Sequence, residues 1–403
     1  MTKLLKTTGI ITASILLAAC NSGGGGGGSS DPNDIPGRDN TGVAVYDFDG
    51  IRIGKYSNAC QDAPSVFATD NLYANISWEV APGNQNPDGT INHDGKQHDV
   101  DDNVVKNILR AAQLSLEVLA SDHNMNIVND FNMGIADDEK LEICIVPPLG
   151  QHALATRNYF EIGTGRTNKN LDNILDHEFV HVTNYRVAKH PLSAEAWELW
   201  LLEGVATYFE NRAQVSRDTM LRFTNTGFLP TDIISLWEAH LYRMAGGDQS
   251  IEYSSYSSVF AYLEHMGSTN EDVWNYFKLL GELETNCRLT QYEAHHNGYT
   301  DRETGKYFPP FTVGESYDYS ERYDMTGMFC VNEDDEGYND PSKENASVLT
   351  WVYDPSVGKE IAVGANNHSE IAFNQAFYEK TGVSYMEIRN KEFFSRNITN
   401  GFL

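Results

Sequence analysis

The segment Asp176-His177-Glu178-Phe179-Val180-His181 carries a His-Glu-x-x-His pattern, and Trp200-Leu201-Leu202-Glu203-Gly204-Val205-Ala206-Thr207-Tyr208 follows it. On a helix, His177 and His181 leave the same face because they are four residues apart. That spacing suits two nitrogen ligands of one tetrahedral zinc ion. Glu178 lies about 100° around the helix from His177, so it can reach a water on the metal without being a ligand.

Glu203 is the candidate third ligand, on a second helix predicted over residues 193–214. Two histidines and one glutamate leave the fourth zinc position open for water, which is typical of catalytic rather than structural sites. Gly204 costs about 1 kcal/mol relative to alanine in a helix, so we expect a close helix–helix approach there. The alternative is two buried histidines in an ordinary helical hairpin.

Together the two motifs resemble those of the gluzincin metallopeptidases, and among them the catalytic region of bacterial collagenases and their relatives. These proteins carry His-Glu-Tyr-x-His, a nearby arginine and Trp-x-x-Glu-Gly-x-Ala-x-Tyr, and Arg186 stands where that arginine would. The resemblance covers residues 140–270, with weaker similarity to the C-terminus. The interval from His181 to Glu203 is shorter than in true collagenases, and no large activator domain or collagen-binding module fits in this chain, so the resemblance leaves open whether collagen is a substrate.

This resemblance implies an α+β gluzincin (thermolysin-like) fold, with a small N-terminal β-containing lobe and a mainly helical C-terminal lobe. It implies one catalytic zinc ion held by His177, His181 and Glu203, with Glu178 as the general base that hydrolyses a peptide or protein substrate. It also implies a tyrosine that hydrogen-bonds the oxyanion. Tyr253 has the gluzincin position relative to Leu263, and Tyr256 follows one turn later; aromatic packing is the alternative for both.

Endopeptidase activity is the preferred expectation. An aminopeptidase is the second candidate, but no Gly-x-Met-x-Asn-like element stands on the preceding strand to hold a free amine. An inactive surface lipoprotein that binds peptides or partner proteins is the third. The strand predicted over Tyr159 to Gly163 corresponds by resemblance to the gluzincin strand that lines the cleft and pairs with an extended substrate.

Residues 1–19 read as a signal peptide, because a positive start is followed by a short apolar core. The segment Leu17-Ala18-Ala19-Cys20 resembles a bacterial lipobox, which predicts lipidation of Cys20; a plain secretory signal is the alternative. Residues 20–40 are a flexible Gly/Ser-rich linker. Asn21 favours the outer membrane, so we expect a lipid-anchored protein of the bacterial cell envelope, touching the membrane only through its lipid.

The net charge of −28 argues against nucleic acid as a partner. No second apolar run approaches the length of a transmembrane helix. We expect a monomer with an N-terminal α+β lobe over residues 41–190, ending in the zinc-binding helix, and a helical lobe over residues 191–403.

Four cysteines remain beside Cys20, and they allow three pairings. Proximity favours Cys60–Cys144 and Cys287–Cys330; a four-cysteine zinc site is the alternative, without Cys-x-x-Cys spacing to support it. The acidic run Glu333-Asp334-Asp335-Glu336 lacks an EF-hand pattern, so a solvated loop is preferred over Ca²⁺ binding.

Local patterns predict the remaining elements. We expect a hairpin over 43–54, a strand within 66–80 and a polar loop over 84–102. A solvated loop is preferred there over a metal site built from His93, His98, Asp99, Asp101 and Asp102. Further expected elements are helices over 102–121, 232–245 and 252–263, a buried strand over 141–146, and C-terminal helices that begin at Ser369 and Ser384.

Overall fold

The structure is a computed structural model of the whole chain. It describes residues 43–47, 57–85, 91–130, 140–156, 158–166, 168–187, 198–210, 216–233, 236–281, 299–300, 307–308, 350–354, 359–363 and 368–403. The chain divides into two compact units. The larger unit consists of Ala19–Asn86, Thr90–Thr285 and His368–Leu403, and the smaller of Met1–Ala18, Pro87–Gly89 and Asn286–Asn367.

A six-stranded sheet with the strand order β1-β2-β3-β6-β8-β7 lies in the larger unit. The pairs β3–β6 and β6–β8 are parallel, and the other pairs are antiparallel. The strands are Tyr46–Asp47 (β1), Ser65–Ala68 (β2), Leu72–Ile76 (β3), Leu141–Ile145 (β6), Ala153–Ala155 (β7) and Tyr159–Ile162 (β8). With the helices described below, this confirms a mixed α+β architecture.

The N-terminal strands differ from the prediction. The single strand expected within residues 66–80 is divided, because the chain reverses between β2 and β3 and the Thr69 N–H donates to the Leu72 carbonyl at 2.8 Å. β1 pairs with β2, while residues 48–56, which would complete the expected 43–54 hairpin, lie outside the described residues. The buried strand expected over 141–146 is confirmed as β6.

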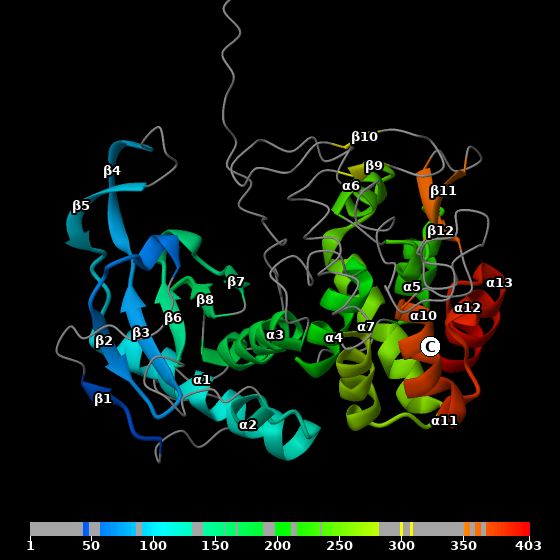
Figure 1. Cartoon of the computed structure of the whole chain (residues 1–403), viewed down its shortest axis with the longest axis horizontal. Coiled ribbons are helices and arrows are strands. Elements are labelled where there is room, and N and C mark those ends of the chain that lie inside the picture. Colours follow the sequence, from blue (N-terminus) through cyan, green and yellow to red (C-terminus); the bar gives the residue numbers. More distant parts are fainter. Residues whose placement is uncertain are drawn as a thin grey trace, which may run out of the picture. The chain divides into compact units, whose positions relative to one another are not determined.

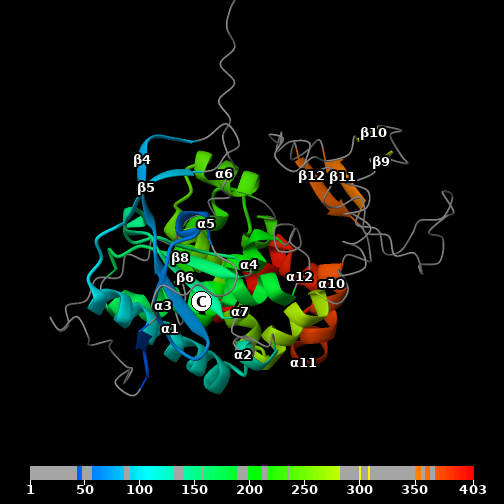
Figure 2. The same cartoon turned by 60° about the vertical axis from the view of Figure 1, so that its left-hand side comes forward.

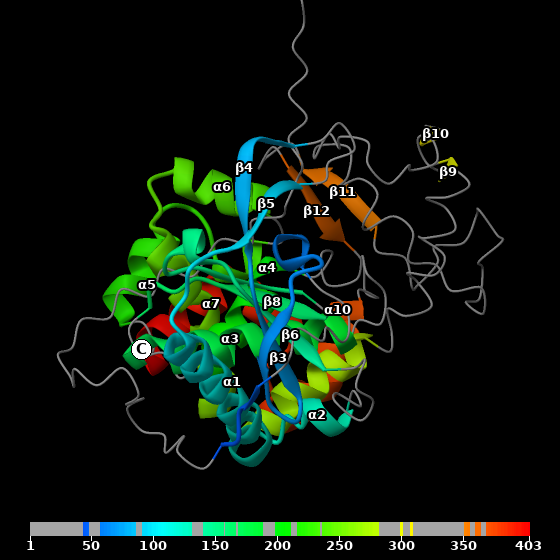
Figure 3. The ribbon, with the colours of Figure 1, turned by 90° about the vertical axis from the view of Figure 1, so that its left-hand side faces the viewer.

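Two helices pack on this sheet (Figures 1 and 3). Helix α1 (Asp102–His123) begins at Asp101, whose carboxylate accepts a hydrogen bond from the Asn103 N–H, as expected for its N-cap. Helix α3 (Asn168–Val187) follows β8. Phe160 of β8 meets Phe179 of α3 edge to face, with ring centroids 5.3 Å apart. The helix that carries the histidines is therefore anchored on the sheet core.

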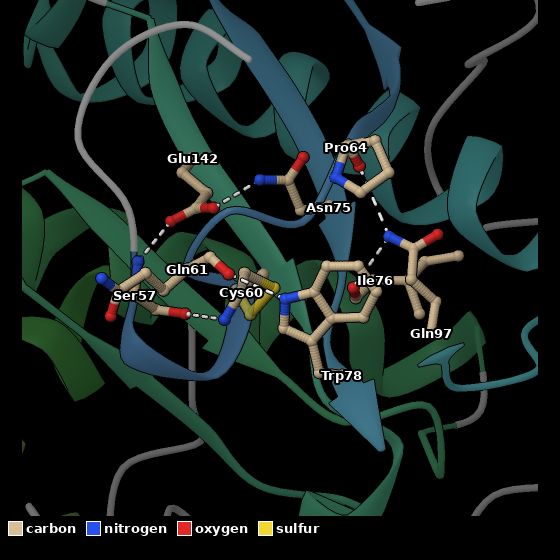
Figure 4. The surroundings of a disulfide bond; sticks show 10 residues. Ser57, Cys60, Gln61, Pro64, Asn75, Ile76, Trp78, Gln97 and Glu142 are labelled. Atoms are coloured by element: carbon tan, nitrogen blue, oxygen red, sulfur yellow. Dashed lines mark hydrogen bonds between the residues drawn. A yellow bond between two sulfur atoms is a disulfide. The ribbon is translucent and has the colours of Figure 1, made fainter. Parts of the chain in front are cut away.

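The predicted Cys60–Cys144 disulfide is confirmed, and it ties the 3-10 turn Asn58–Cys60 to β6 (Figure 4). Both cysteines are fully buried. Beside the disulfide, the buried Glu142 carboxylate accepts hydrogen bonds from the Ser57 N–H and from Asn75 Nδ2. The segment before β2 is therefore fixed to the middle of the sheet by both covalent and polar links.

A hairpin replaces the polar loop predicted over residues 84–102. Strands β4 (Trp78–Gln85) and β5 (Ile91–Gln97) pair antiparallel, with the register shifted at two places. Trp78 and His93 stack at 4.6 Å between ring centroids. The register shifts explain why no regular alternation marks these strands in the sequence.

The larger unit continues with helices α4 (Leu199–Phe209), α5 (Arg217–Thr224), α6 (Leu236–Met244) and α7 (Gln249–His265), a 3-10 turn η5 (Pro230–Asp232) and a helical stretch over residues 270–281. Helix α4 ends at Phe209, so Glu210 is a cap residue rather than part of a helix to residue 214. The helix expected over residues 252–263 is confirmed as part of α7. Among the described residues, no helix is long and apolar enough to span a membrane.

The C-terminal segment is helical, as expected, but interrupted (Figure 2). A π-helical stretch, Asn374–Tyr378, lies between α10 (His368–Phe373) and α11 (Glu379–Thr381), and Gly382 ends α11 in the left-handed conformation. Ser384 and Glu387 form a capping box for α12 (Tyr385–Ile388). The single last helix that was predicted is divided, because α13 (Lys391–Phe393) and the π-helical Phe394–Phe402 follow separately.

In the smaller unit the structure describes two strand pairs. β9 (Tyr299–Thr300) pairs with β10 (Tyr307–Phe308), and β11 (Thr350–Asp354) pairs with β12 (Lys359–Val363). Cys20, Cys287, Cys330 and the acidic run at 333–336 lie outside the described residues. Lipidation, the second disulfide and calcium binding therefore stay predictions.

Candidate metal centre

The His-Glu-x-x-His motif lies in the second half of α3, as predicted. His177 and His181 are one helical turn apart and both are buried. Their Nε2 atoms are 3.0 Å from each other. Two nitrogen lone pairs so close together need either a shared proton or a cation between them.

Glu203 of α4 completes a triangle with the two histidines. Its Oε2 lies 3.3 Å from His177 Nε2 and 3.4 Å from His181 Nε2. A tetrahedral zinc site with bonds of about 2.0–2.1 Å has ligand–ligand edges of about 3.3–3.4 Å. The two edges to Glu203 match one face of that tetrahedron, and the edge of 3.0 Å between the histidines is somewhat shorter. These three residues are the group that could hold a metal ion among the described residues.

The charge at this triangle also fits a cation. Glu203 Oε2 is buried and faces the Nε2 atoms of both histidines. Burial alone would raise the pKa of Glu203, but the charges of the protonated His181 and His177 rings and hydrogen bonds from both rings outweigh it and lower that pKa to about 2. A cation bound here would replace the histidine protons and supply the positive charge that this buried carboxylate needs.

Gly204 explains how α4 reaches α3 and α7 at once. A Cβ at this position would lie 3.0 Å from Phe260 Cε2 and 3.1 Å from the backbone carbon of Tyr256, both on α7. The expected close helix–helix approach is therefore confirmed. It places Glu203 against the histidines while α4 packs on α7.

Glu210 is a member of the site that the motifs did not identify. Its Oε2 lies 2.8 Å from His177 Nδ1, and both side chains are almost fully buried. The Nδ1–H therefore donates to Glu210, which leaves the Nε2 lone pair directed at the triangle. A signal was present in the sequence: Glu210 follows Glu203 by seven residues, two helical turns, and so lies on the same side of α4.

Glu178 is buried beside the triangle. Burial raises its pKa, and the charge of Glu203 raises it further, while His177, His181 and Arg166 oppose the shift. Glu178 is the neighbour of His177 in α3, and its carboxylate is almost fully buried. The prediction that it lies near the metal without being a ligand fits this arrangement.

The two tyrosines of α7 were predicted to supply a hydrogen bond to the oxyanion. The Tyr256 hydroxyl donates to Glu252 Oε1 at 2.7 Å, and Glu252 in turn pairs with Arg243 at 3.3 Å. Tyr253 is buried next to Tyr256, with ring centroids 6.0 Å apart. The hydroxyl of Tyr256 is thus engaged within its own helix, and an oxyanion role for either tyrosine stays a prediction.

The strand with a free edge for pairing with a substrate is not the one that we expected. β8, expected to pair with substrate, is bonded on both sides, by β6 and by β7. Among the described strands of this sheet, β7 (Ala153–Ala155) is the edge on this side. The sequence could not show this, because which strand lies at an edge depends on pairings between distant segments.

Of the residues in the alternative histidine and aspartate site, Asp101 caps α1, and His93 lies in β5, where it stacks on Trp78. No protein-family model, no curated protein and no solved structure matches this chain. A functional proposal for it therefore comes from its own residues.

Proposed function

We propose that this chain is a zinc-dependent metallopeptidase of the gluzincin type, cleaving peptide bonds within peptide or protein substrates. The observation that carries the proposal is the triangle of His177 Nε2, His181 Nε2 and Glu203 Oε2, with edges of 3.0, 3.3 and 3.4 Å. These three residues would hold the metal. When bound, zinc supplies a Lewis acid that polarises a carbonyl group and lowers the pKa of water to about 7.

The chain's own residues supply the remaining roles. Glu178 would take the proton of the attacking water and return it to the leaving amine. Burial raises the pKa of Glu178, which favours its holding the proton before passing it to the leaving amine. Glu210 would hold the His177 ring in one orientation and one tautomer.

An extended substrate would add to the sheet at β7, the edge strand on this side. Binding through backbone hydrogen bonds tolerates varied side chains, which suits an endopeptidase. The Cys60–Cys144 disulfide supports a location in an oxidising compartment, and the lipid anchor at Cys20 would place the enzyme at the cell envelope.

The test compares two matched substitutions in purified protein. Glu178→Gln should retain zinc and lose about 10²- to 10⁴-fold in turnover of a quenched-fluorescent peptide, because only the general base is removed. Glu203→Gln should lose zinc affinity itself, because a neutral amide is a weaker ligand than a carboxylate. Wild-type protein that takes up no zinc, or a Glu178→Gln variant with full activity, would sink the proposal.

A further inference from the structure

The beginning of α4 is held by residues from the other end of the chain. Glu198, the residue before α4, is buried, and its carboxylate accepts hydrogen bonds from three side chains. Trp200 Nε1 donates from within the helix. The Tyr385 hydroxyl and Arg389 Nη1 donate from the C-terminal segment, the latter at 2.8 Å. These partners are 187 and 191 residues away in sequence.

This cluster differs from an ordinary surface ion pair. Tyr385 is buried and the Arg389 side chain is only 21% exposed, so solvent screens the charges little. Removing one partner would leave a buried charge without its counterpart, which strongly favours the single arrangement observed. The Glu198 side chain makes no capping bond to α4, so its carboxylate serves the contact with the C-terminal segment.

Neighbouring contacts join the same elements. The Thr231 hydroxyl of η5 donates to the Ile388 carbonyl of α12 at 3.4 Å. The Trp200 N–H of α4 donates to the Ile233 carbonyl at 3.3 Å. The start of α4, the η5 turn and α12 therefore meet at one place, with Glu198 as the charged group between them.

Three contacts along helix α4 fix its position. Glu198 at its start binds Arg389, Gly204 in its middle packs against α7, and Glu210 at its end contacts His177. Glu203 lies between the first two. A helix moves as a rigid rod that rises about 1.5 Å per residue, so a shift at Glu198 also moves Glu203. Zinc–ligand distances vary by only about 0.2 Å, so a small shift matters at the metal.

We infer that Arg389 and Tyr385 are positioning residues for the metal centre: by holding Glu198 they fix α4, and thereby place Glu203 between the two histidines. The inference rests on the metal-binding part of the proposed function. It gives the C-terminal segment a role in metal affinity although it contributes no ligand.

The experiment measures zinc affinity of the full-length protein by competition with a chromophoric chelator. Tyr385→Phe removes one hydroxyl and keeps the buried ring, so it tests the inference even if Arg389→Ala fails to fold. Both variants should bind zinc about 10-fold more weakly, the lower end of the range for residues that hydrogen-bond a ligand directly, because Tyr385 and Arg389 act through Glu198. The visible spectrum of the Co²⁺-loaded protein should change as well, because it reports ligand number and geometry.

Two control variants distinguish an effect on the position of α4 from a general loss of protein stability. Lys380→Ala breaks the pair with Asp272, which joins the same C-terminal segment to the helical stretch 270–281 rather than to α4, and it should leave zinc affinity unchanged. Leu72→Ala removes a buried side chain of β3, a strand that packs mainly on β2, β6 and α1 rather than on α3 or α4, and it should lower Tm. In the double variant Glu198→Gln/Arg389→Ala, affinity should be no lower than in Glu198→Gln alone, because Arg389 acts through Glu198.

Wild-type zinc affinity in Tyr385→Phe, or in a folded Arg389→Ala variant, overturns the inference and leaves the proposed function standing. A loss of affinity in Leu72→Ala equal to theirs at equal Tm also overturns it, because stability is then the cause. Absence of zinc uptake by the wild-type protein overturns both.

Discussion

His177 Nδ1 and Glu210 Oε2 are 2.8 Å apart, and this contact joins the helix of the two histidines to the end of the helix that carries Glu203. The two residues are 33 positions apart in the sequence. The carboxylate decides which ring nitrogen keeps the proton, so it also decides that Nε2 faces the triangle of donor atoms. One buried contact thus sets the orientation, the tautomer and the basicity of a candidate ligand.

Replacing Glu210 by glutamine should weaken zinc binding by about 10- to 100-fold, because the neutral amide no longer supports the His177 proton. Isothermal titration or chelator competition at constant pH measures this. Glu392→Gln, an exposed substitution of the same kind, serves as the control and should bind zinc normally. Equal affinity in the two variants would show that Glu210 does not act on the ligand.

Gly204→Ala should destabilise the protein by about 1–3 kcal/mol, although alanine is the better helix former by about 1 kcal/mol. The new methyl group would meet Phe260 and the Tyr256 backbone at 3.0–3.1 Å and separate α4 from α7. Urea denaturation gives the free energy of unfolding, and zinc affinity should fall in parallel because Glu203 is the neighbouring residue. A variant more stable than wild type would contradict the close packing described above.

Loss of the Cys60–Cys144 disulfide should lower the free energy of unfolding by about 2–5 kcal/mol. The bond links positions 84 residues apart, and chain-entropy arguments give about 4.5 kcal/mol for a loop of that length. The measurement is urea denaturation of Cys60→Ala/Cys144→Ala beside wild type under oxidising conditions. Zinc binding below the transition should persist, because neither cysteine contributes to the metal triangle. Equal stability of the two proteins would contradict this expectation.

Asp272 should stabilise the protein in a pH-dependent way. Burial alone would raise its pKa, but hydrogen bonds from Lys380 and from the Thr269 N–H and hydroxyl outweigh it, and the pKa lies below its usual value. A carboxyl group with a lowered folded-state pKa stabilises above its unfolded pKa of about 3.9, and this contribution disappears as the pH falls through the folded-state pKa.

Asp272→Asn should therefore lower Tm at pH 7, and its difference from wild type should shrink as the pH falls below about 4. Thermal unfolding followed by circular dichroism across this range measures the difference. The same difference in Tm at neutral and acidic pH would mean that the charge of Asp272 contributes nothing.

The sequence predicted the elements that carry the site because their signals are local. Apolar spacing and the His-Glu-x-x-His motif define α3, and the Glu-Gly pair marks the point where α4 approaches α7 closely. The Asp101 cap and the Ser384–Glu387 capping box likewise depend only on residues that are close together in the sequence. Side chains that must meet within one or two turns of a helix can be identified from spacing alone.

Features that depend on distant pairings were missed or misplaced. The β4–β5 hairpin lacks regular alternation because its register shifts, and the edge position of β7 follows only from the order of the whole sheet. The engagement of the Tyr256 hydroxyl by Glu252 depends on rotamers within α7. Glu210 could have been found from its two-turn spacing to Glu203, but its partner His177 lies on another helix.

The sequence distances of these contacts bear on the order of folding. Asn75 and Glu142, which join β3 to β6, are 67 residues apart, about twice the 33 residues between His177 and Glu210. Each doubling of a loop costs about 0.6 kcal/mol more in closure entropy, so the contact between α3 and the end of α4 is the easier of the two to close. On the proposed metal site, zinc would stabilise this helix pair wherever it forms before the strands align, so the refolding rate measured by stopped flow should then rise with zinc concentration.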